Sequence, residues 1–216
     1  MAIVQLQSEF AAALSIAPPE YTWATKPSAA GNSGKRITIT GWNAPASDWV
    51  SDGTYWLPVG GRAVVHAPRL VGAIAQHPSM AAVASVPTWQ MPADMVAIPG
   101  LYIEANAECT VANASNVSYR RIYCGISSKQ HLISGPEGAS TNNGFRLWGK
   151  TSRKPDGNWT THGANAQPIN ESLFGTDTST SADLASSPIG MWYRGGNTDG
   201  SEILSIHSFS LAVGVG

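Results

Sequence analysis

The chain has 216 residues, of which 43% are hydrophobic and only 12% are charged, and its formal net charge is −1. That balance excludes the strongly basic surface with which a protein binds nucleic acid or an anionic membrane. Because about a quarter of the residues in an ordinary domain are charged, we expect this surface to be neutral or buried against other subunits. No apolar run reaches the roughly 18 residues that a membrane-spanning helix needs.

Residues 1–35 are predicted to form an N-terminal anchoring arm and linker. Ser8 can cap a short helix in which Phe10 and Leu14 share an apolar side, and Pro18-Pro19 ends it. A helix of about eight residues is marginal alone, so it must dock on its own domain or insert into another protein as an anchor, and the sequence leaves both open. Residues 26–34 have the composition of a flexible linker. The first residues lack a basic leader, which favours assembly in a cytoplasm.

Residues 36–90 are predicted to form a β-hairpin and a connecting region. Arg36–Trp42 alternates as a strand, and Asp52-Gly53 supplies the turn of a two-residue hairpin. That turn would pair Trp49 with Trp56. We interpret the two tryptophans as packing that holds the hairpin together, in preference to a sugar-binding platform. Periodicity does not decide whether residues 68–86 form edge strands or a helix.

Residues 91–216 are predicted to form a β-sandwich. Leu101–Ala112 alternates strictly between apolar and polar residues, as a long strand with one buried face does. Pairing it in a hairpin with Val117–Ile126 would place Cys109 opposite Cys124, with apolar residues of both strands on one face. A reducing compartment favours two small buried thiols there over a cross-strand disulfide.

Further strands are predicted at Phe145–Trp148, Ile189–Tyr193 and Glu202–Val213, while residues 161–188 are predicted to form a long loop or weak edge strands. The apolar parity of the last strand changes at His207-Ser208, which indicates a β-bulge. Short strands separated by turns about every ten residues are typical of an antiparallel sandwich. We therefore predict an all-β, jelly-roll-like fold with an N-terminal arm that contains a short helix.

The residues show no catalytic or metal-binding pattern. Glu104 and Glu108 share a strand face but lie about 13 Å apart by strand rise, which is beyond the spacing of a glycosidase pair. The five histidines lack ligand spacing, and no nucleophile or phosphate-binding motif is present. We expect no enzymatic activity, no cofactor and no metal.

Four aromatic residues are candidates for glycan or subunit contacts, because amphipathic rings are favoured at interfaces. They are Trp148, Trp159, Trp192 and Tyr193. Since large aromatic side chains are usually mostly buried, a place in the core or in a subunit interface is favoured for each.

Ser51–Gly61 resembles the S-D-G-T-x-W-x-P-V-x-G element common in bacteriophage tail-fibre and related virion proteins. The order downstream is similar: Ile98-Pro99-Gly100 leads into the long strand, Tyr119–Gly125 follows it, and the Thr/Asp-rich Gly175–Thr180 precedes the final strand. The resemblance covers about residues 48–213. The chain differs from long fibres because it lacks their fibrous shaft and coiled-coil heptads.

The resemblance implies a β-rich, often jelly-roll-like virion protein that assembles as a homotrimer and attaches to other virion proteins through its N-terminal segment. In such a trimer, the outward face that carries Tyr102, Glu104 and Asn106 could be buried between subunits. The expected function is a structural component of the tail or neck that contributes to attachment at the host surface. The alternatives are a capsid decoration or head-fibre protein and a free carbohydrate-binding module, with a depolymerase as a remote fourth.

Overall fold

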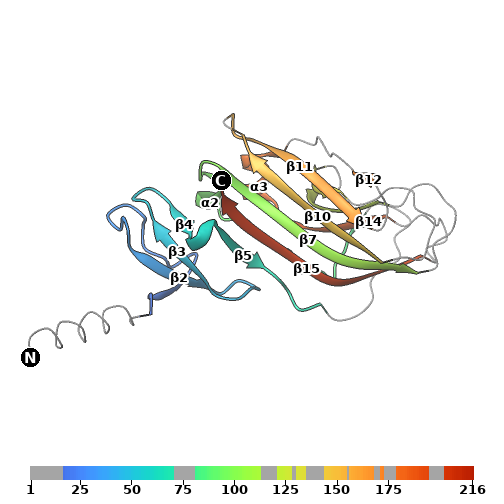
Figure 1. The fold of residues 1–216 in the computed structure, drawn as a ribbon, viewed down its shortest axis with the longest axis horizontal. Coiled ribbons are helices and arrows are strands. Elements are labelled where there is room, and N and C mark those ends of the chain that lie inside the picture. The colour runs from blue at the N-terminus through green and yellow to red at the C-terminus, as the bar shows by residue number, and fades with distance from the viewer. Residues whose placement is uncertain are drawn as a thin grey trace, which may run out of the picture.

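The computed structural model describes residues 17–70, 81–112, 121–127, 130–134, 144–154, 156–167, 171–172, 179–194 and 202–216. These residues form three β-sheets, which we call the N-terminal sheet, the long sheet and the short sheet (Figure 1). The long and short sheets form a sandwich, and the N-terminal sheet lies at one end of it. The predicted all-β class is therefore confirmed. None of the described helices has the length and apolarity that crossing a bilayer requires.

The N-terminal sheet has four strands in sequence order: β1 (Glu20–Thr22), β2 (Arg36–Thr40), β3 (Ser47–Ser51) and β4 (Trp56–Pro58). The first pair is parallel and the others are antiparallel. The strand predicted at Arg36–Trp42 is confirmed up to Thr40. Residues 20–22, predicted as part of a free arm, instead form the edge strand of this sheet. The predicted anchoring residues Phe10 and Leu14 lie outside the described residues.

The long sheet has β7 (Leu101–Ala112) near its middle, flanked on both sides by antiparallel neighbours. Its order is β12 (Glu171–Ser172), β11 (Asn158–Gln167), β10 (Gly144–Arg153), β7, β15 (Ile203–Val215) and β5 (Arg62–His66), and β13 (Ser179–Thr180) also pairs with β11. Alternate residues of β7 from Leu101 to Val111 are buried, and those of the other parity lie on the outward face. The predicted long strand and its buried face are confirmed.

The short sheet covers the buried face with the order β6 (Ala81–Ala82), β14 (Gly190–Arg194), β8 (Arg121–Ser127) and β9 (Gln130–Ser134). Three short helices complete the described elements: η1 (Val59–Gly61), α2 (Ala93–Val96) and α3 (Ser181–Ser186). The buried apolar residues of all three sheets belong to one continuous core.

The predicted hairpin between Leu101–Ala112 and Val117–Ile126 is wrong. β7 pairs with β10 and β15, whereas β8 pairs with β14 and β9 in the other sheet. Cys109 therefore lies opposite Ile206, and Cys124 lies opposite Met191. Alternation identifies the buried face of a strand but not its neighbour, so two strands that bury matching rows can belong to facing sheets. Both cysteines are buried and unbonded, as predicted.

The C-terminal half contains more strand than the sequence indicates. The strand predicted at Phe145–Trp148 extends over Gly144–Arg153, and β11 beside it includes residues 161–167, which were predicted to form a long loop or weak edge strands. α3 also lies within the predicted loop. β11 contains few large apolar residues, so its sequence gives little indication of a strand. The strand forms through its ladder with β10 rather than through intrinsic propensity. The bulge predicted at His207-Ser208 is confirmed by a register shift between Ile206 and Ser208.

We predict that neither cysteine reacts with a thiol reagent in the native protein. Burial raises the pKa of both thiols to about 12, so the reactive thiolate is scarce at neutral pH and also shielded. Labelling with a chromogenic disulfide should be at least about tenfold slower in buffer than in denaturant, where both thiols are exposed. Equal rates in the two conditions would contradict the buried placement of Cys109 and Cys124.

Candidate functional site

The hairpin that carries the S-D-G-T-x-W-x-P-V-x-G element has a longer loop than predicted. Ser51 pairs with Trp56 and Trp49 with Pro58, so the predicted pairing of Trp49 with Trp56 is wrong. The Asp52 carboxylate is the reason: its Oδ1 accepts hydrogen bonds from the backbone N–H groups of Thr54 and Tyr55, both at 2.7 Å. Gly53 follows with a φ of 97°, which favours glycine. An Asx-type turn thus replaces the predicted two-residue turn, and Asp52 and Gly53 lie in the four-residue loop that closes the hairpin.

Residues 26–34, predicted as a flexible linker, are instead tied to this hairpin. Trp56 Nε1 donates to the Pro27 carbonyl at 2.8 Å, and Ser51 Oγ donates to the Ala29 carbonyl at 2.9 Å. The Gly34 N–H donates to the Ser51 carbonyl at 2.8 Å. Small and polar composition suits a linker, but it equally suits a segment whose carbonyls are satisfied by side chains far along the chain. The segment therefore forms an ordered strap over the hairpin.

Four tryptophans join the N-terminal sheet to the sandwich. Trp23 stacks on Trp42 with ring centroids 5.4 Å apart, and Trp49 meets both rings edge-on. Trp42 also meets Trp89 edge-on at 6.3 Å. Trp89 belongs to the sandwich, where it bridges to Ile189. These offset and edge-to-face geometries are the favoured ones for aromatic pairs, so the contact holds the two parts in a defined orientation.

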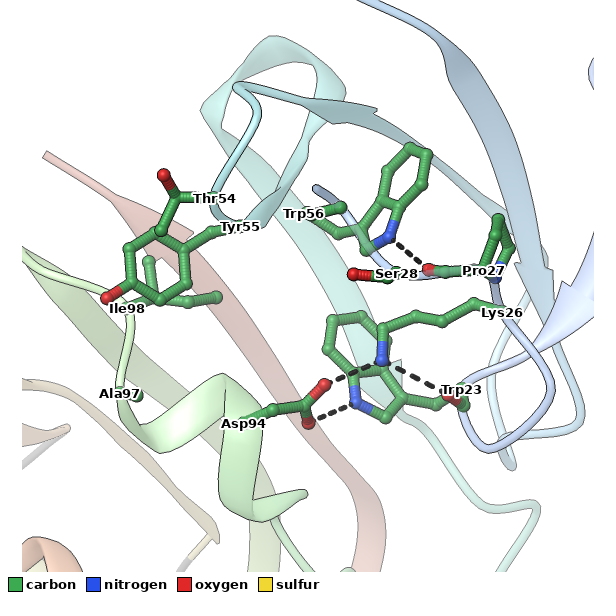
Figure 2. Close-up of a pocket in the computed structure, with 11 residues that line it drawn as sticks. Trp23, Lys26, Pro27, Ser28, Thr54, Tyr55, Trp56, Asp94, Ala97 and Ile98 are labelled. Atoms are coloured by element: carbon green, nitrogen blue, oxygen red, sulfur yellow. Dashed lines mark hydrogen bonds and ion pairs between the residues drawn. The ribbon is translucent and has the colours of Figure 1, made fainter. Parts of the chain in front are cut away.

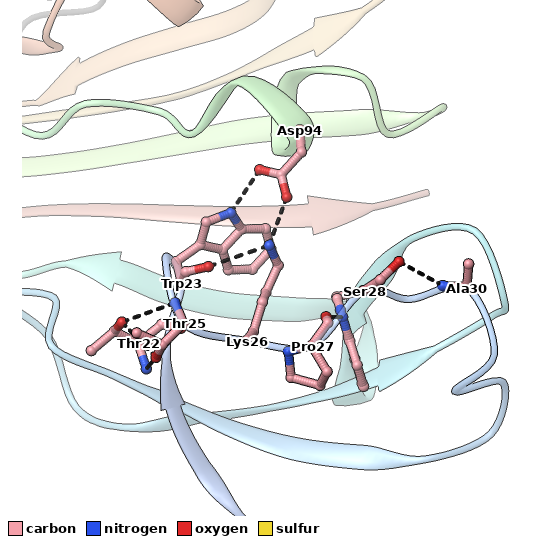
Figure 3. A network of polar contacts seen from close by, with 9 residues as sticks. Thr22, Trp23, Thr25, Lys26, Pro27, Ser28, Ala30 and Asp94 are labelled. Carbon is pink, nitrogen blue, oxygen red and sulfur yellow. Dashed lines mark hydrogen bonds and ion pairs between the residues drawn. The ribbon is translucent and has the colours of Figure 1, made fainter.

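Asp94 makes the main polar link across the same junction. Its Oδ1 accepts a hydrogen bond from Trp23 Nε1 at 2.8 Å, and its Oδ2 lies 2.6 Å from Lys26 Nζ (Figure 3). The Lys26 ammonium also lies 4.3 Å from the centroid of the Trp23 ring. Partial burial by itself raises the pKa of Asp94, but the hydrogen bonds from Lys26 and Trp23 and the charge of Lys26 outweigh it, so the pKa is lowered. The folded protein therefore favours the ionised carboxylate.

A pocket of about 290 Å³ opens beside this link, between the hairpin, the strap and α2 (Figure 2). Its lining combines three aromatic side chains, two hydroxyl groups and the Lys26–Asp94 pair. The lining residues are Trp23, Lys26, Pro27, Ser28, Ala29, Thr54, Tyr55, Trp56, Asp94, Ala97 and Ile98. The carboxylate and the ammonium are bound to each other, and Trp23 and Trp56 donate to protein oxygens. The polar groups of this pocket thus hold the junction together.

The outward face of the long sheet carries a second cluster, centred on Trp148. This side chain is 37% exposed. Its Nε1 donates to Glu104 Oε1 at 3.2 Å, and Glu104 Oε2 lies 2.6 Å from Arg62 Nε. Burial alone would raise the pKa of Glu104, but the hydrogen bonds from Arg62 and Trp148 outweigh it and lower the pKa. Glu104 is therefore ionised, and its carboxylate accepts the hydrogen bond that orients the Trp148 indole.

Tyr102 and Lys150 form the neighbouring part of this face. The Lys150 ammonium lies 3.6 Å from the centroid of the Tyr102 ring, within the range of a cation–π contact. The same ring lies so close over Gly214 that a Cβ there would collide with it. Glycine at position 214 is required by this contact, and Tyr102 is held between the backbone of β15 and the Lys150 side chain. Of the two aromatic residues on this face, Trp148 is the exposed one.

The other candidate aromatic residues do not join Trp148. Trp159 and Tyr193 are buried in the core, as the favoured interpretation predicted. Tyr193 donates from its hydroxyl to the buried Glu202 at 2.5 Å. Trp192 is half-buried on the short sheet and donates to the Gly125 carbonyl at 3.3 Å. These three side chains therefore serve the sandwich itself.

The described residues contain no group of three or more His, Cys, Asp or Glu side chains able to hold a metal ion. His66, on β5, is buried, and its Nε2 lies 2.8 Å from the Pro87 carbonyl oxygen. Burial lowers the pKa of this histidine, against the opposing effect of that hydrogen bond. A neutral imidazole that donates to a carbonyl is a structural feature of the core.

Sequence reasoning did not identify the three residues of the polar link across the junction. Asp94 follows Pro92 at the start of a four-residue helix and carries no motif. Trp23 and Lys26 lie in the segment that composition assigned to an arm and a linker. Contacts such as Trp23 to Asp94 span 71 positions, and no local pattern encodes them.

No protein-family model matches the chain, and no curated protein matches its sequence. Among solved structures, the chain is similar to lectin UEA-II complexed with galactose, with a TM-score of 0.34 and 8% sequence identity over 84% of this chain and 87% of that one. A likeness of this degree carries no argument about a ligand. The fold assignment rests on the three sheets.

We predict that Asp94→Asn destabilises the protein by about 0.5–1 kcal/mol at pH 6, because asparagine keeps the acceptor for Trp23 but removes the charge opposite Lys26. The pKa of Asp94 is lowered from 3.8, so its contribution is complete above about pH 4 and is lost as the pH falls through the lower, folded-state value. Urea titrations followed by tryptophan fluorescence should therefore show a difference between the two proteins that shrinks towards zero in acid.

The matched control for this prediction is Asp48→Asn, since Asp48 is an exposed aspartate of β3 whose hydrogen-bond donor is the neutral hydroxyl of Thr38. It should change the free energy of unfolding at pH 6 by less than about 0.5 kcal/mol. A destabilisation by Asp94→Asn that stays constant down to pH 2 would contradict an electrostatic role for Asp94.

Proposed function

We propose that the chain is a non-enzymatic structural protein of a bacteriophage virion, attached through its N-terminal segment and displaying its β-sandwich outward. One observation carries the proposal. The Ser51–Gly61 element, on which the resemblance to virion proteins rests, is built into the hairpin to which the strap of residues 26–34 is tied. The element thus has a structural role, to hold the strap in place, and this role suits an attachment protein.

The placement of the sheets supports separate attachment and display ends. In Figure 1 the N-terminal sheet lies at one end of the long axis, and β7 and β15 run from it towards the other end. Figure 1 shows the C-terminus at the same end as the N-terminal sheet, and the Gly216 N–H donates there to the Gly100 carbonyl at 3.3 Å. The far end of the sandwich is then the part that points away from the attachment point.

The junction is stiff, which also suits this role. The stacked and edge-on tryptophans are reinforced by the Asp94 contacts with Trp23 and Lys26. A displayed domain that is joined by packed rings and an ion pair keeps its orientation, whereas a flexible linker would let it swing.

The proposal includes assembly of identical copies, with a trimer as the resemblance implies, and a place in the tail, neck or capsid of the particle. The low charge content supports it, because a chain with only 12% charged residues has few charges to place on its surface, which suits contact with other subunits better than free solution. Assembly would take place in the host cytoplasm.

We predict that removing residues 1–16 abolishes incorporation into phage particles while leaving the rest of the chain folded. The deletion must stop before β1, because Trp23 and Ala29 are buried in the core and a longer deletion would unfold the N-terminal sheet. Incorporation is measured by quantitative mass spectrometry of purified particles, and folding by circular dichroism and thermal unfolding of the free protein.

A double variant narrows the test to the predicted anchoring side chains. Phe10→Asp with Leu14→Asp should reduce incorporation as strongly as the deletion, because charges on the apolar side of the helix prevent its insertion into a partner. The matched control, Gln5→Ala with Gln7→Ala, should leave incorporation unchanged. Normal incorporation of the deleted chain would rule out the anchor.

A further inference from the structure

We propose that the outward face of the long sheet around Trp148 binds a neutral oligosaccharide, with the indole as the stacking platform. The site lies on β10 and β7 of the long sheet, and this inference goes beyond the proposed structural function and is independent of it. The purified chain is sufficient to test it.

The first argument is that the Trp148 ring is both exposed and held in place. Its Nε1 is bonded to Glu104, which is itself bonded to Arg62, so the indole is oriented before any ligand arrives. An aromatic ring exposed to water can pack against the C–H groups on the apolar face of a sugar while the hydroxyl groups of the sugar point outward. Because the ring is already ordered, little conformational entropy is lost when a ligand binds.

The second argument is the set of hydrogen-bonding groups around the indole. Asn106 lies opposite Trp148 on the neighbouring strand, and its Oδ1 accepts a hydrogen bond from Arg146 Nη2 at 3.4 Å. A carboxylate, an amide and a guanidinium are planar groups that can each meet two neighbouring hydroxyls. Glu104, Asn106 and Arg146 therefore surround the indole with donors and acceptors suited to sugar hydroxyls.

The third argument is charge. The described residues of this face include three cations, Arg62, Arg146 and Lys150, and two carboxylates, Glu104 and Glu108. Arg62 is paired with Glu104, and Lys150 lies over the Tyr102 ring. A polyanion such as nucleic acid binds through a continuous basic groove, which this mixed and internally paired face does not provide. A neutral ligand fits it better than an anionic one.

The same composition argues against a second copy of the chain as the occupant. The centre of a stable subunit interface is depleted of charged residues and rich in apolar ones. Here one exposed indole is surrounded by charged and amide side chains, and Ser208 and Ser210 lie opposite Glu108 and Asn106 on the next strand. The face resembles an open, hydroxyl-compatible surface rather than a dry interface.

The extended outward face of the long sheet suits a stretch of an oligosaccharide chain rather than a buried terminal unit. Outward side chains recur along β10 every second residue, at about 6.6 Å, which is on the scale of a single sugar ring. Arg146 and Lys150 therefore flank Trp148 at distances where units on either side of a stacked ring would lie.

The test is a glycan array of neutral hexose oligosaccharides, followed by isothermal titration calorimetry with the hexasaccharide that binds best. Trp148→Ala should raise the dissociation constant about tenfold or more, and Trp148→Phe should restore part of the affinity because the stacking surface remains. Arg146→Ala should weaken binding by about three- to tenfold through lost hydrogen bonds. Affinity should change less than about twofold between 50 and 500 mM NaCl, since no counterions are released.

The matched control is Tyr55→Ala, which removes an aromatic ring from the junction pocket and should leave glycan affinity unchanged. Circular dichroism and the native mass of each variant show that fold and assembly are kept. The proposal is overturned if no neutral oligosaccharide binds, or if Trp148→Ala leaves affinity unchanged. It is also overturned if a single-stranded oligonucleotide binds this face better with a steep salt dependence, or if Trp148→Ala changes the native mass, which would make the face a subunit interface.

Discussion

The alternation of β7 is the constraint on which both faces of this protein depend. Its inward residues from Leu101 to Val111 are buried against the short sheet, and this row fixes which side of the long sheet faces the core. Because side chains of a strand alternate, the same register necessarily directs Tyr102, Glu104 and Asn106 outward. A slip of one residue would bury two glutamates and expose the core row, so the packing of the core also determines the composition of the outward face.

A different kind of interaction unites the N-terminal sheet with the sandwich. Trp23, Trp42 and Trp49 pack together within the N-terminal sheet, and Trp42 reaches Trp89 across the junction. The aromatic rings pack against one another there, while the Asp94 carboxylate accepts a hydrogen bond from the indole N–H of Trp23 and pairs with the ammonium of Lys26. Burial of the aromatic rings is non-directional and would allow several orientations of the N-terminal sheet on the sandwich. The directional polar contacts of Asp94 select one of them.

The outward face of the long sheet shows how an exposed aromatic ring is kept ordered. The orientation of the Trp148 ring depends on its hydrogen bond to Glu104, and Glu104 is held in turn by its ion pair with Arg62. The three residues come from β10, β7 and β5, respectively. Tyr102 is ordered in another way, by close contact with Gly214 and by the ammonium of Lys150. The side chains of this face are therefore ordered in advance although the face is not hydrophobic, which is consistent with a binding role. Charged side chains are grouped here in a chain that is otherwise poor in charge.

Local sequence patterns were enough to predict the all-β class, the buried row of β7, the strand at Ile189–Tyr193, the bulge near His207 and the burial of both cysteines. Each of these follows from local periodicity or from the size and polarity of single residues. Long-range packing, in contrast, places β7 and β8 in different sheets, closes a four-residue loop with Asp52 and holds residues 26–34 as a strap. It also decided which of the candidate aromatic residues is exposed: Trp148 lies on the outward face, whereas Trp159 and Tyr193 are buried. The physical reason is that alternation specifies the face on which a side chain lies, while strand neighbours and contacts such as Arg62 to Glu104 depend on how distant segments pack.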